Sequence, residues 1–139
     1  MIMRKFIEEP GEMPISKEDF EYMEEKYGVK FPEEFKAFYM VNNGLEIHLC
    51  RFKEKYELSS FLPLRGKWSI EYVKDDFDSD EIVPKYMIPF GDDEGGDFYF
   101  INLNDGAVYS IRGDSITKHV KIADSFNEFL DMLDNSVIQ

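Results

Sequence analysis

The sequence predicts an α+β fold in which helices at both ends flank an antiparallel β-sheet. Three observations lead to this prediction. Residues 16–44 contain two stretches of helical periodicity, and residues 86–120 contain four short strand-like runs separated by turn residues. Helical periodicity then returns over residues 125–133. Two N-terminal helices, a linking helix in the middle and a C-terminal helix are therefore expected around the sheet.

The first helix is predicted to begin after Ser16 and to end at Gly28. Asp19 stands three residues after Ser16, which is the spacing of a capping box. Apolar residues follow at helical spacing: Phe20, Met23 and Tyr27. The preceding residues 1–14 contain two prolines and a glycine, which predicts an irregular arm.

A second helix is predicted after Pro32, because the missing N–H of proline costs nothing at a helix start. Asn42-Asn43-Gly44 ends it. The residues that follow alternate as in a strand, and residues 56–58 predict another. The stretch from Trp68 to Phe77 fits both a helix and a strand, and we favour a helix that ends near Asp76.

Four strand-like runs occupy the second half of the chain: residues 86–90, 98–102, 107–111 and 116–120. Turn residues separate them: 91–97, 104–106 and 113–114. Connections this short leave no room for the crossover that parallel strands need, so the runs predict an antiparallel meander. Ser125 and Glu128 then have capping-box spacing and predict the C-terminal helix.

Composition limits the classes of function. A chain of 139 residues with 43% hydrophobic content is expected to fold as one domain, residues 1–139. It has one cysteine, Cys50, and no long apolar run, so we expect a soluble protein of the cytoplasm. The net charge of −13 disfavours binding to nucleic acid and to anionic membranes.

The acidity is unevenly distributed along the chain. Residues 75–139 contain 15 acidic and 4 basic residues, against 14 and 12 in residues 1–74. The densest segment holds five acids within seven residues: Asp75, Asp76, Asp78, Asp80 and Glu81. It is either a solvated linker or a patch that steers a basic partner.

A second acidic segment lies in the glycine-rich stretch of residues 91–97. It contains Asp92, Asp93, Glu94 and Asp97. Such residues typically build a turn between two strands, which is the favoured interpretation, and a contact with a basic partner is compatible with it. Binding of Ca²⁺ or Mg²⁺ is the alternative, but the spacing does not match an EF-hand. We therefore predict no metal site.

No catalytic centre is visible in the sequence. His48 and Cys50 stand two apart in a predicted strand, but no third zinc ligand accompanies them at a known spacing. No motif that activates a nucleophile and no cofactor fingerprint is present. Trp68 and Tyr72 are either anchors of a protein interface or half-buried packing residues.

Three landmarks, taken in order, resemble the SUKH superfamily, also described as the Smi/Knr-like domain. They are residues 31–38 leading into Asn42-Asn43-Gly44, residues 88–98 followed by 100–103, and residues 106–109 followed by 123–130. The resemblance extends from Ser16 to Leu133, nearly the whole chain.

The resemblance implies a function. Members that resemble this chain are mostly bacterial immunity proteins, which bind and neutralise a cognate polymorphic toxin, often a nuclease. We therefore expect a stoichiometric binder that occludes a basic toxin surface. Two alternatives stay open: an intracellular regulatory scaffold, like the fungal relatives that act in cell-wall signalling, and a small metal-dependent hydrolase that uses residues 92–97.

Overall fold

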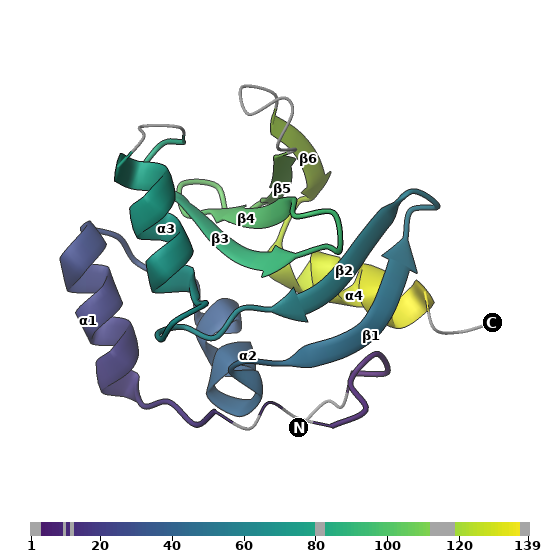
Figure 1. Ribbon diagram of the computed structural model, residues 1–139, viewed down its shortest axis with the longest axis horizontal. Coiled ribbons are helices and arrows are strands. Elements are labelled where there is room, and N and C mark those ends of the chain that lie inside the picture. Colours follow the sequence, from purple (N-terminus) through teal and green to yellow (C-terminus); the bar gives the residue numbers. More distant parts are fainter. Residues whose placement is uncertain (1–3, 10, 12, 80–82, 112–118, 137–139) are drawn as a thin grey trace.

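The computed structural model describes residues 4–9, 11, 13–79, 83–111 and 119–136. Their elements, in chain order, are α1 (Lys17–Tyr27), α2 (Glu33–Asn42), β1 (Glu46–Phe52), β2 (Tyr56–Phe61), α3 (Ile70–Ser79), β3 (Met87–Asp92), β4 (Phe98–Asn102), β5 (Val108–Ile111), β6 (His119–Ala123) and α4 (Phe126–Ser136). The strands form one sheet in chain order, and every neighbouring pair is antiparallel (Figure 1). The predicted α+β fold and the antiparallel meander are confirmed.

Helices α3 and α4 cover opposite faces of the sheet, as the side chains of β4 show. Tyr99 packs against Phe129 of α4, with ring centroids 5.7 Å apart. Its neighbours Phe98 and Phe100 pack instead against Phe77 of α3, at 5.7 and 5.4 Å. Successive residues of a strand point to opposite faces, so the two helices form separate layers with the sheet between them.

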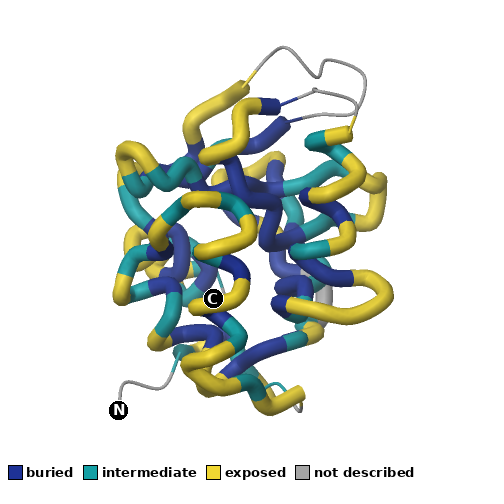
Figure 2. The backbone as a smooth tube through the Cα atoms, turned by 90° about the vertical axis from the view of Figure 1, so that its left-hand side faces the viewer, coloured by how far each residue is buried: buried dark blue, intermediate teal, exposed yellow. Residues whose placement is uncertain are grey.

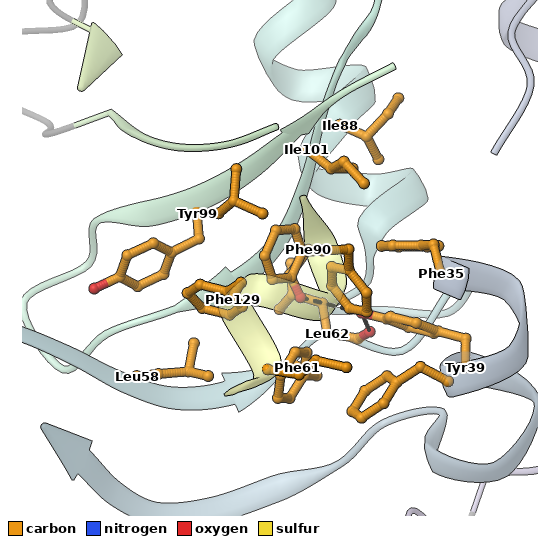
Figure 3. Packing of buried hydrophobic residues seen from close by; sticks show 14 of the residues in the cluster. Phe35, Tyr39, Leu58, Phe61, Leu62, Ile88, Phe90, Tyr99, Ile101 and Phe129 are labelled. Atoms are coloured by element: carbon orange, nitrogen blue, oxygen red, sulfur yellow. Dashed lines mark hydrogen bonds between the residues drawn. The ribbon is translucent and has the colours of Figure 1, made fainter. Parts of the chain in front are cut away.

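The main core lies between α2, α4 and the sheet, and it is rich in aromatic rings. Phe126, at the start of α4, is fully buried, and its ring centroid lies 4.9 Å from Phe35, 5.5 Å from Phe38 and 5.3 Å from Phe90. Figure 3 shows Phe35 and Phe90 among their buried neighbours. Backbone segments that are buried lie inside the molecule and exposed segments lie around them (Figure 2). Aromatic burial on this scale is a dominant source of folding free energy.

The predicted helix caps are present. The Ser16 N–H donates to the Asp19 carboxylate at 2.9 Å, and Gly28 ends α1 with a φ of 65°, in the left-handed region. At the other end of the chain, the Glu128 N–H donates to the Ser125 hydroxyl at 3.0 Å. These local signals determined where the helices begin and end.

Several boundaries differ from the prediction. Strand β3 continues through Gly91 and Asp92, which pair with Tyr99 and Phe98 of β4. Helix α3 extends to Ser79, whose hydroxyl donates to the C=O of Asp76. Strand β6 (His119–Ala123) extends beyond the predicted end at Val120, while its predicted start at 116–118 and the predicted turn at 113–114 lie outside the described residues.

The described residues of the N-terminal arm contain no helix or strand, but the arm is attached to the core. Phe6 is buried and stacks on Phe61 of β2, with ring centroids 6.0 Å apart. The Lys5 N–H donates to the Asp134 carboxylate of α4 at 2.6 Å. The arm therefore packs against both the sheet and α4.

Gly91 of β3 lies against residues of β2 and has little room for a side chain. A Cβ atom at this position would lie 2.9 Å from Leu58 Cδ1 and 3.2 Å from the Ser60 carbonyl oxygen. We expect Gly91→Ala to lower the free energy of unfolding by about 1–3 kcal/mol, because overpacking forces its neighbours apart. Equilibrium unfolding in urea measures the change.

Gly95→Ala is the matched control in the same hairpin. Its Cβ would meet only the Asp93 Oδ1 atom, at 3.4 Å, which is an ordinary contact. We expect a change within about 0.5 kcal/mol. Equal destabilisation by the two substitutions would contradict the packing argument.

Candidate functional site

Three aromatic side chains meet at the exposed side of α3: Trp68, Tyr72 and Phe98, which we call the aromatic patch. Trp68 is 52% exposed and Tyr72 is 54% exposed, whereas Phe98 is half-buried. The Trp68 ring centroid lies 6.1 Å from that of Tyr72 and 5.9 Å from that of Phe98. Clustered apolar groups on a surface mark interaction sites more often than single exposed residues do.

The connection between β2 and α3 is fixed by hydrogen bonds to buried groups. The Leu62 N–H donates to the Phe90 carbonyl at 2.7 Å, and the Tyr39 hydroxyl donates to the Leu62 carbonyl at 2.8 Å. Further along, the Leu64 N–H donates to the Asn43 side-chain oxygen at 2.7 Å. These hydrogen bonds fix the backbone of residues 62–64, which lead to Trp68 of the aromatic patch.

Ser69 fixes the start of α3. Its buried hydroxyl accepts the Tyr72 N–H at 3.1 Å and donates to the Gly66 carbonyl at 2.9 Å. Trp68 stands immediately before this cap, and Tyr72 lies in the first turn after it. A cap thus determines where the two exposed rings of the patch emerge.

Asp92, at the end of β3, and the turn that follows it, residues 93–97, lie beside the patch, and we call residues 92–97 together the acidic turn. Asp92 joins the two: one carboxylate oxygen accepts the Ser60 hydroxyl at 2.6 Å, and the other accepts the Trp68 indole N–H at 3.4 Å. The structure thus brings together one of the predicted acidic segments and both predicted aromatic anchors.

Within the acidic turn the carboxylates differ in their surroundings. The Asp93 carboxylate accepts the Asp97 N–H at 3.0 Å, and the Asp93 N–H donates to the Asp97 carbonyl at 3.1 Å. Asp93 therefore helps to build the turn. Glu94 is exposed at its tip, and Asp97 is half-buried where the chain enters β4.

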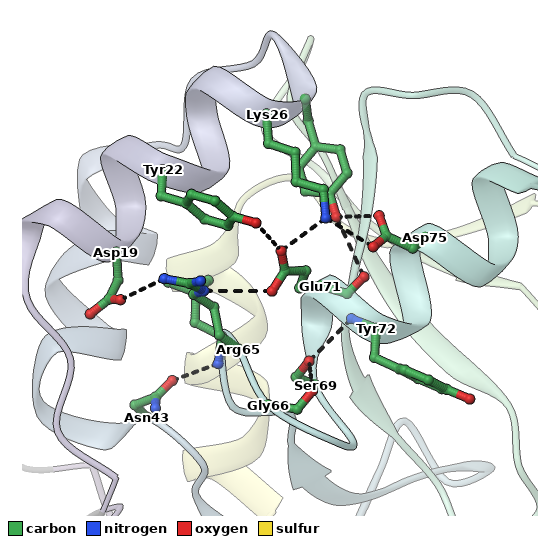
Figure 4. A network of polar contacts seen from close by, with 12 residues as sticks. Asp19, Tyr22, Lys26, Asn43, Arg65, Gly66, Ser69, Glu71, Tyr72 and Asp75 are labelled. Carbon is green, nitrogen blue, oxygen red and sulfur yellow. Dashed lines mark hydrogen bonds and ion pairs between the residues drawn. The ribbon is translucent and has the colours of Figure 1, made fainter.

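The acids of the first acidic segment, residues 75–81, have different surroundings. The Asp75 carboxylate faces α1, where it accepts the Tyr27 hydroxyl at 2.6 Å and lies 2.9 Å from the Lys26 ammonium (Figure 4). Asp78 pairs with the buried Lys74 at 3.1 Å. Asp76 is exposed one helical turn after Tyr72. Asp80 and Glu81 lie outside the described residues.

Helices α1 and α3 are joined by a network of charged and polar side chains (Figure 4). Glu71 is at its centre, accepting the Tyr22 hydroxyl at 2.7 Å and the Lys26 ammonium at 2.9 Å. Arg65 lies 3.5 Å from Glu71, pairs with Asp19 at 3.3 Å and stacks on the Tyr22 ring, 3.9 Å from its centroid. This network holds one side of α3 and leaves Tyr72 pointing away from it.

The network favours the charged forms of its two acids, Glu71 and Asp75, whereas burial disfavours the charged form of Lys74. Desolvation alone would raise the pKa of Glu71, but hydrogen bonds from Lys26 and Tyr22 hold that pKa below its ordinary value. Asp75 is likewise desolvated, and hydrogen bonds from Tyr27 and Lys26 lower its pKa. Burial lowers the pKa of Lys74, and the Asp78 carboxylate opposes that effect.

The described residues offer little for metal or thiol chemistry. Among the residues that the structure describes, no three His, Cys, Asp or Glu side chains form a group that could hold a metal ion. The Cys50 thiol is buried, which raises its pKa, and the His48 side chain lies outside the described residues. No helix in the described part of the chain is long and apolar enough to cross a membrane.

Comparison with known families identifies the fold that carries these features. The model of the SMI1 / KNR4 family (SUKH-1) matches residues 14–132. The chain belongs to this family. None of the curated proteins compared with this SUKH-1 protein matches it. The match includes the aromatic patch and the acidic turn.

Sequence reasoning named Trp68 and Tyr72 but missed Phe98 and Ser69 of this SUKH-1 protein. Phe98 begins a run of apolar residues in β4, and such a run does not reveal which residues share a face with α3. Ser69 carried a usable signal, because a serine just before an apolar period is typical of a helix start.

The α1–α3 network of this SUKH-1 protein generates a stability prediction. We expect Glu71→Gln to lower the free energy of unfolding at about pH 7 by about 2 kcal/mol, because charged hydrogen bonds to Lys26 and Tyr22 are lost. The pKa of Glu71 is lowered in the folded state, so its contribution is present above the ordinary value of 4.5 and disappears as the pH falls through the folded-state value. Urea unfolding at about pH 7 and about pH 3 should show the difference between variant and parent decreasing in acid.

The exposed Glu25 provides the control. Glu25→Gln removes the same charge from α1, and we expect a change within about 0.5 kcal/mol at both pH values. A loss from Glu71→Gln that does not depend on pH would rule out its charge as the cause.

Proposed function

We propose that this SUKH-1 protein is an immunity protein that binds a cognate polymorphic toxin, a nuclease, and neutralises it by occlusion. The chain acts in the cytoplasm as one domain and as a stoichiometric binder without catalysis of its own. Membership of the SMI1/KNR4 family supports this proposal, because members that resemble this chain are mostly bacterial immunity proteins.

The charge of the chain supports a basic partner. A net charge of −13 repels phosphate groups and attracts a surface rich in Lys and Arg. A nuclease needs such a surface to bind its own substrate. An acidic protein that covers this surface competes directly with the nucleic acid.

The single observation that supports this location of the binding face is the aromatic patch beside the acidic turn. Trp68 and Tyr72 are more than half exposed, and Asp92 joins the acidic turn to the indole of Trp68. Aromatic anchors supply binding energy when a partner desolvates them, and nearby acids increase the rate of encounter. The patch is thus suited to be the centre of an interface with an acidic rim.

Protection of cells from the toxin tests the function, and substitution in the aromatic patch tests the binding face. The toxin to use is the product of the neighbouring gene, expressed in cells with or without this chain. We expect the parent chain to protect, and Trp68→Ala to weaken toxin binding at least thirtyfold, which corresponds to about 2 kcal/mol for an interface hot spot. Isothermal titration measures the affinity, and cell survival measures the protection.

Val41→Ala is the control, because Val41 is also apolar and 45% exposed but lies on α2. It should bind and protect like the parent chain. No protection by the parent would contradict the immunity function. Full protection and unchanged affinity in Trp68→Ala would leave the function intact and place the face elsewhere.

The acidic rim is tested separately through association kinetics. We expect the double variant Asp76→Asn/Glu94→Gln to associate roughly threefold more slowly at low salt, because two exposed charges beside the patch no longer steer the toxin. The salt dependence of its association rate should also decrease. Stopped-flow measurement at low and moderate salt gives both quantities.

The matched control is Glu33→Gln/Glu128→Gln, which removes the same charge from exposed positions on α2 and α4. Its association rate should stay closer to that of the parent. Equal slowing by both pairs would mean that net charge, and not the rim, accelerates binding.

A further inference from the structure

Trp68 is exposed and yet held in one place. Its indole N–H donates to Asp92, and its ring contacts Tyr72 and Phe98. An exposed tryptophan with several partners loses little conformational freedom when a ligand binds it. The face of the Trp68 ring is therefore preorganised for binding.

Carboxylates surround this surface more densely than bases do. Asp92 lies beside the indole, the remaining acids of the acidic turn follow it, and Asp76 lies one helical turn after Tyr72. Of the nearby bases, Lys67 is exposed next to Trp68 in the chain, and Arg65 is paired with Asp19 and Glu71 on the side of α1. An aromatic face next to a carboxylate favours a cation, and acids this close disfavour the phosphates of a nucleic acid.

The same chain shows how it binds a guanidinium group. On the α1 side of α3, Arg65 lies 3.9 Å from the centroid of the Tyr22 ring while it pairs with Asp19 at 3.3 Å and Glu71 at 3.5 Å. An aromatic ring and carboxylates thus enclose one arginine side chain (Figure 4). The aromatic patch offers the same groups, and within the described residues no lysine or arginine lies over the rings of Trp68 or Tyr72.

We propose that the aromatic patch is a receptor for an arginine side chain of a basic protein partner. The planar guanidinium stacks on Trp68 or Tyr72 and donates hydrogen bonds to carboxylates of the acidic turn, with Asp92 the nearest to the indole. A lysine ammonium binds less well, because it neither stacks as a plane nor donates two parallel hydrogen bonds to one carboxylate. This inference deepens the proposed function, on which the identity of the partner rests.

The experiment uses Trp68 as its own reporter, because it is the only tryptophan of the chain. The probe is a short peptide in which arginine alternates with glycine, and a lysine peptide of the same length and charge is the comparison. We expect saturable quenching or a shift of the tryptophan emission, with at least about threefold tighter binding of the arginine peptide. Binding curves are measured at two salt concentrations.

Variants separate a receptor from general attraction between opposite charges. Tyr72→Ala and Asp92→Asn should each weaken binding of the arginine peptide and reduce its advantage over the lysine peptide. The pair Glu33→Gln/Glu128→Gln, which removes charge far from the patch, should keep that advantage. Circular dichroism and urea unfolding establish that the variants are folded.

The outcomes are distinguishable from those of the immunity function. Equal affinity for the two peptides, or an arginine advantage that survives both patch variants, overturns the receptor even if the chain protects cells from its toxin. An arginine advantage that the patch variants abolish supports the receptor even if the chain gives no protection, and in that case only the immunity function fails.

Discussion

Strand β4 has apolar side chains on both faces, and this constraint shapes the layers of the molecule. Tyr99 and Ile101 point towards α4, whereas Phe98 and Phe100 point towards α3. A strand that is apolar on both sides must be covered on both sides. Helix α4 covers its face with a large aromatic core, whereas Phe98 on the α3 face stays half-buried. The incomplete cover is where Trp68 and Tyr72 emerge.

Helix α3 is held on two sides by different kinds of interaction. Phe77 packs on β4, and Glu71 and Asp75 bind Tyr22, Tyr27 and Lys26 of α1. Polar attachment contributes less burial than an apolar interface, but it fixes geometry, because each charged hydrogen bond has a preferred distance and direction. The acids of α3 that face α1 are therefore structural. Asp76, which lies on neither of these sides, is exposed.

Much of the fold was predictable because its signals are local. The capping box at Ser16, the cap at Ser125 and the left-handed Gly28 act within a few residues, so the sequence shows them directly. The end of α3 was predicted too early, at Asp76, because the Lys74–Asp78 pair that supports its last turn combines burial with charge. Burial depends on packing by other elements, which a single sequence does not reveal.

The candidate site was predictable only in part, for the same reason. The five acids of residues 75–81 form one group in the sequence, but Asp75 binds Lys26, which lies far away in the chain and close in space. The sequence predicted the acidic turn and Trp68 as separate features. Helix α3 and strand β3 lie between them in the chain, and no spacing rule shows that residues so separated meet in space. Exposure of the two aromatic rings is likewise a tertiary property, which the sequence alone does not show.

Net charge and local geometry have different consequences for the choice of partner. A charge of −13 attracts every basic protein, and in physiological salt its effect fades beyond about 8 Å. The proposed function requires the chain to distinguish its toxin from the many basic proteins that bind the nucleic acids of the cell. That discrimination has to come from groups in contact, and the groups with fixed positions here are Trp68 and the Asp92 carboxylate that accepts its indole N–H. In the proposed receptor a planar cation stacks on the ring and reaches the carboxylate at the edge of the ring. An ion at another place gains only the attraction that all basic surfaces share.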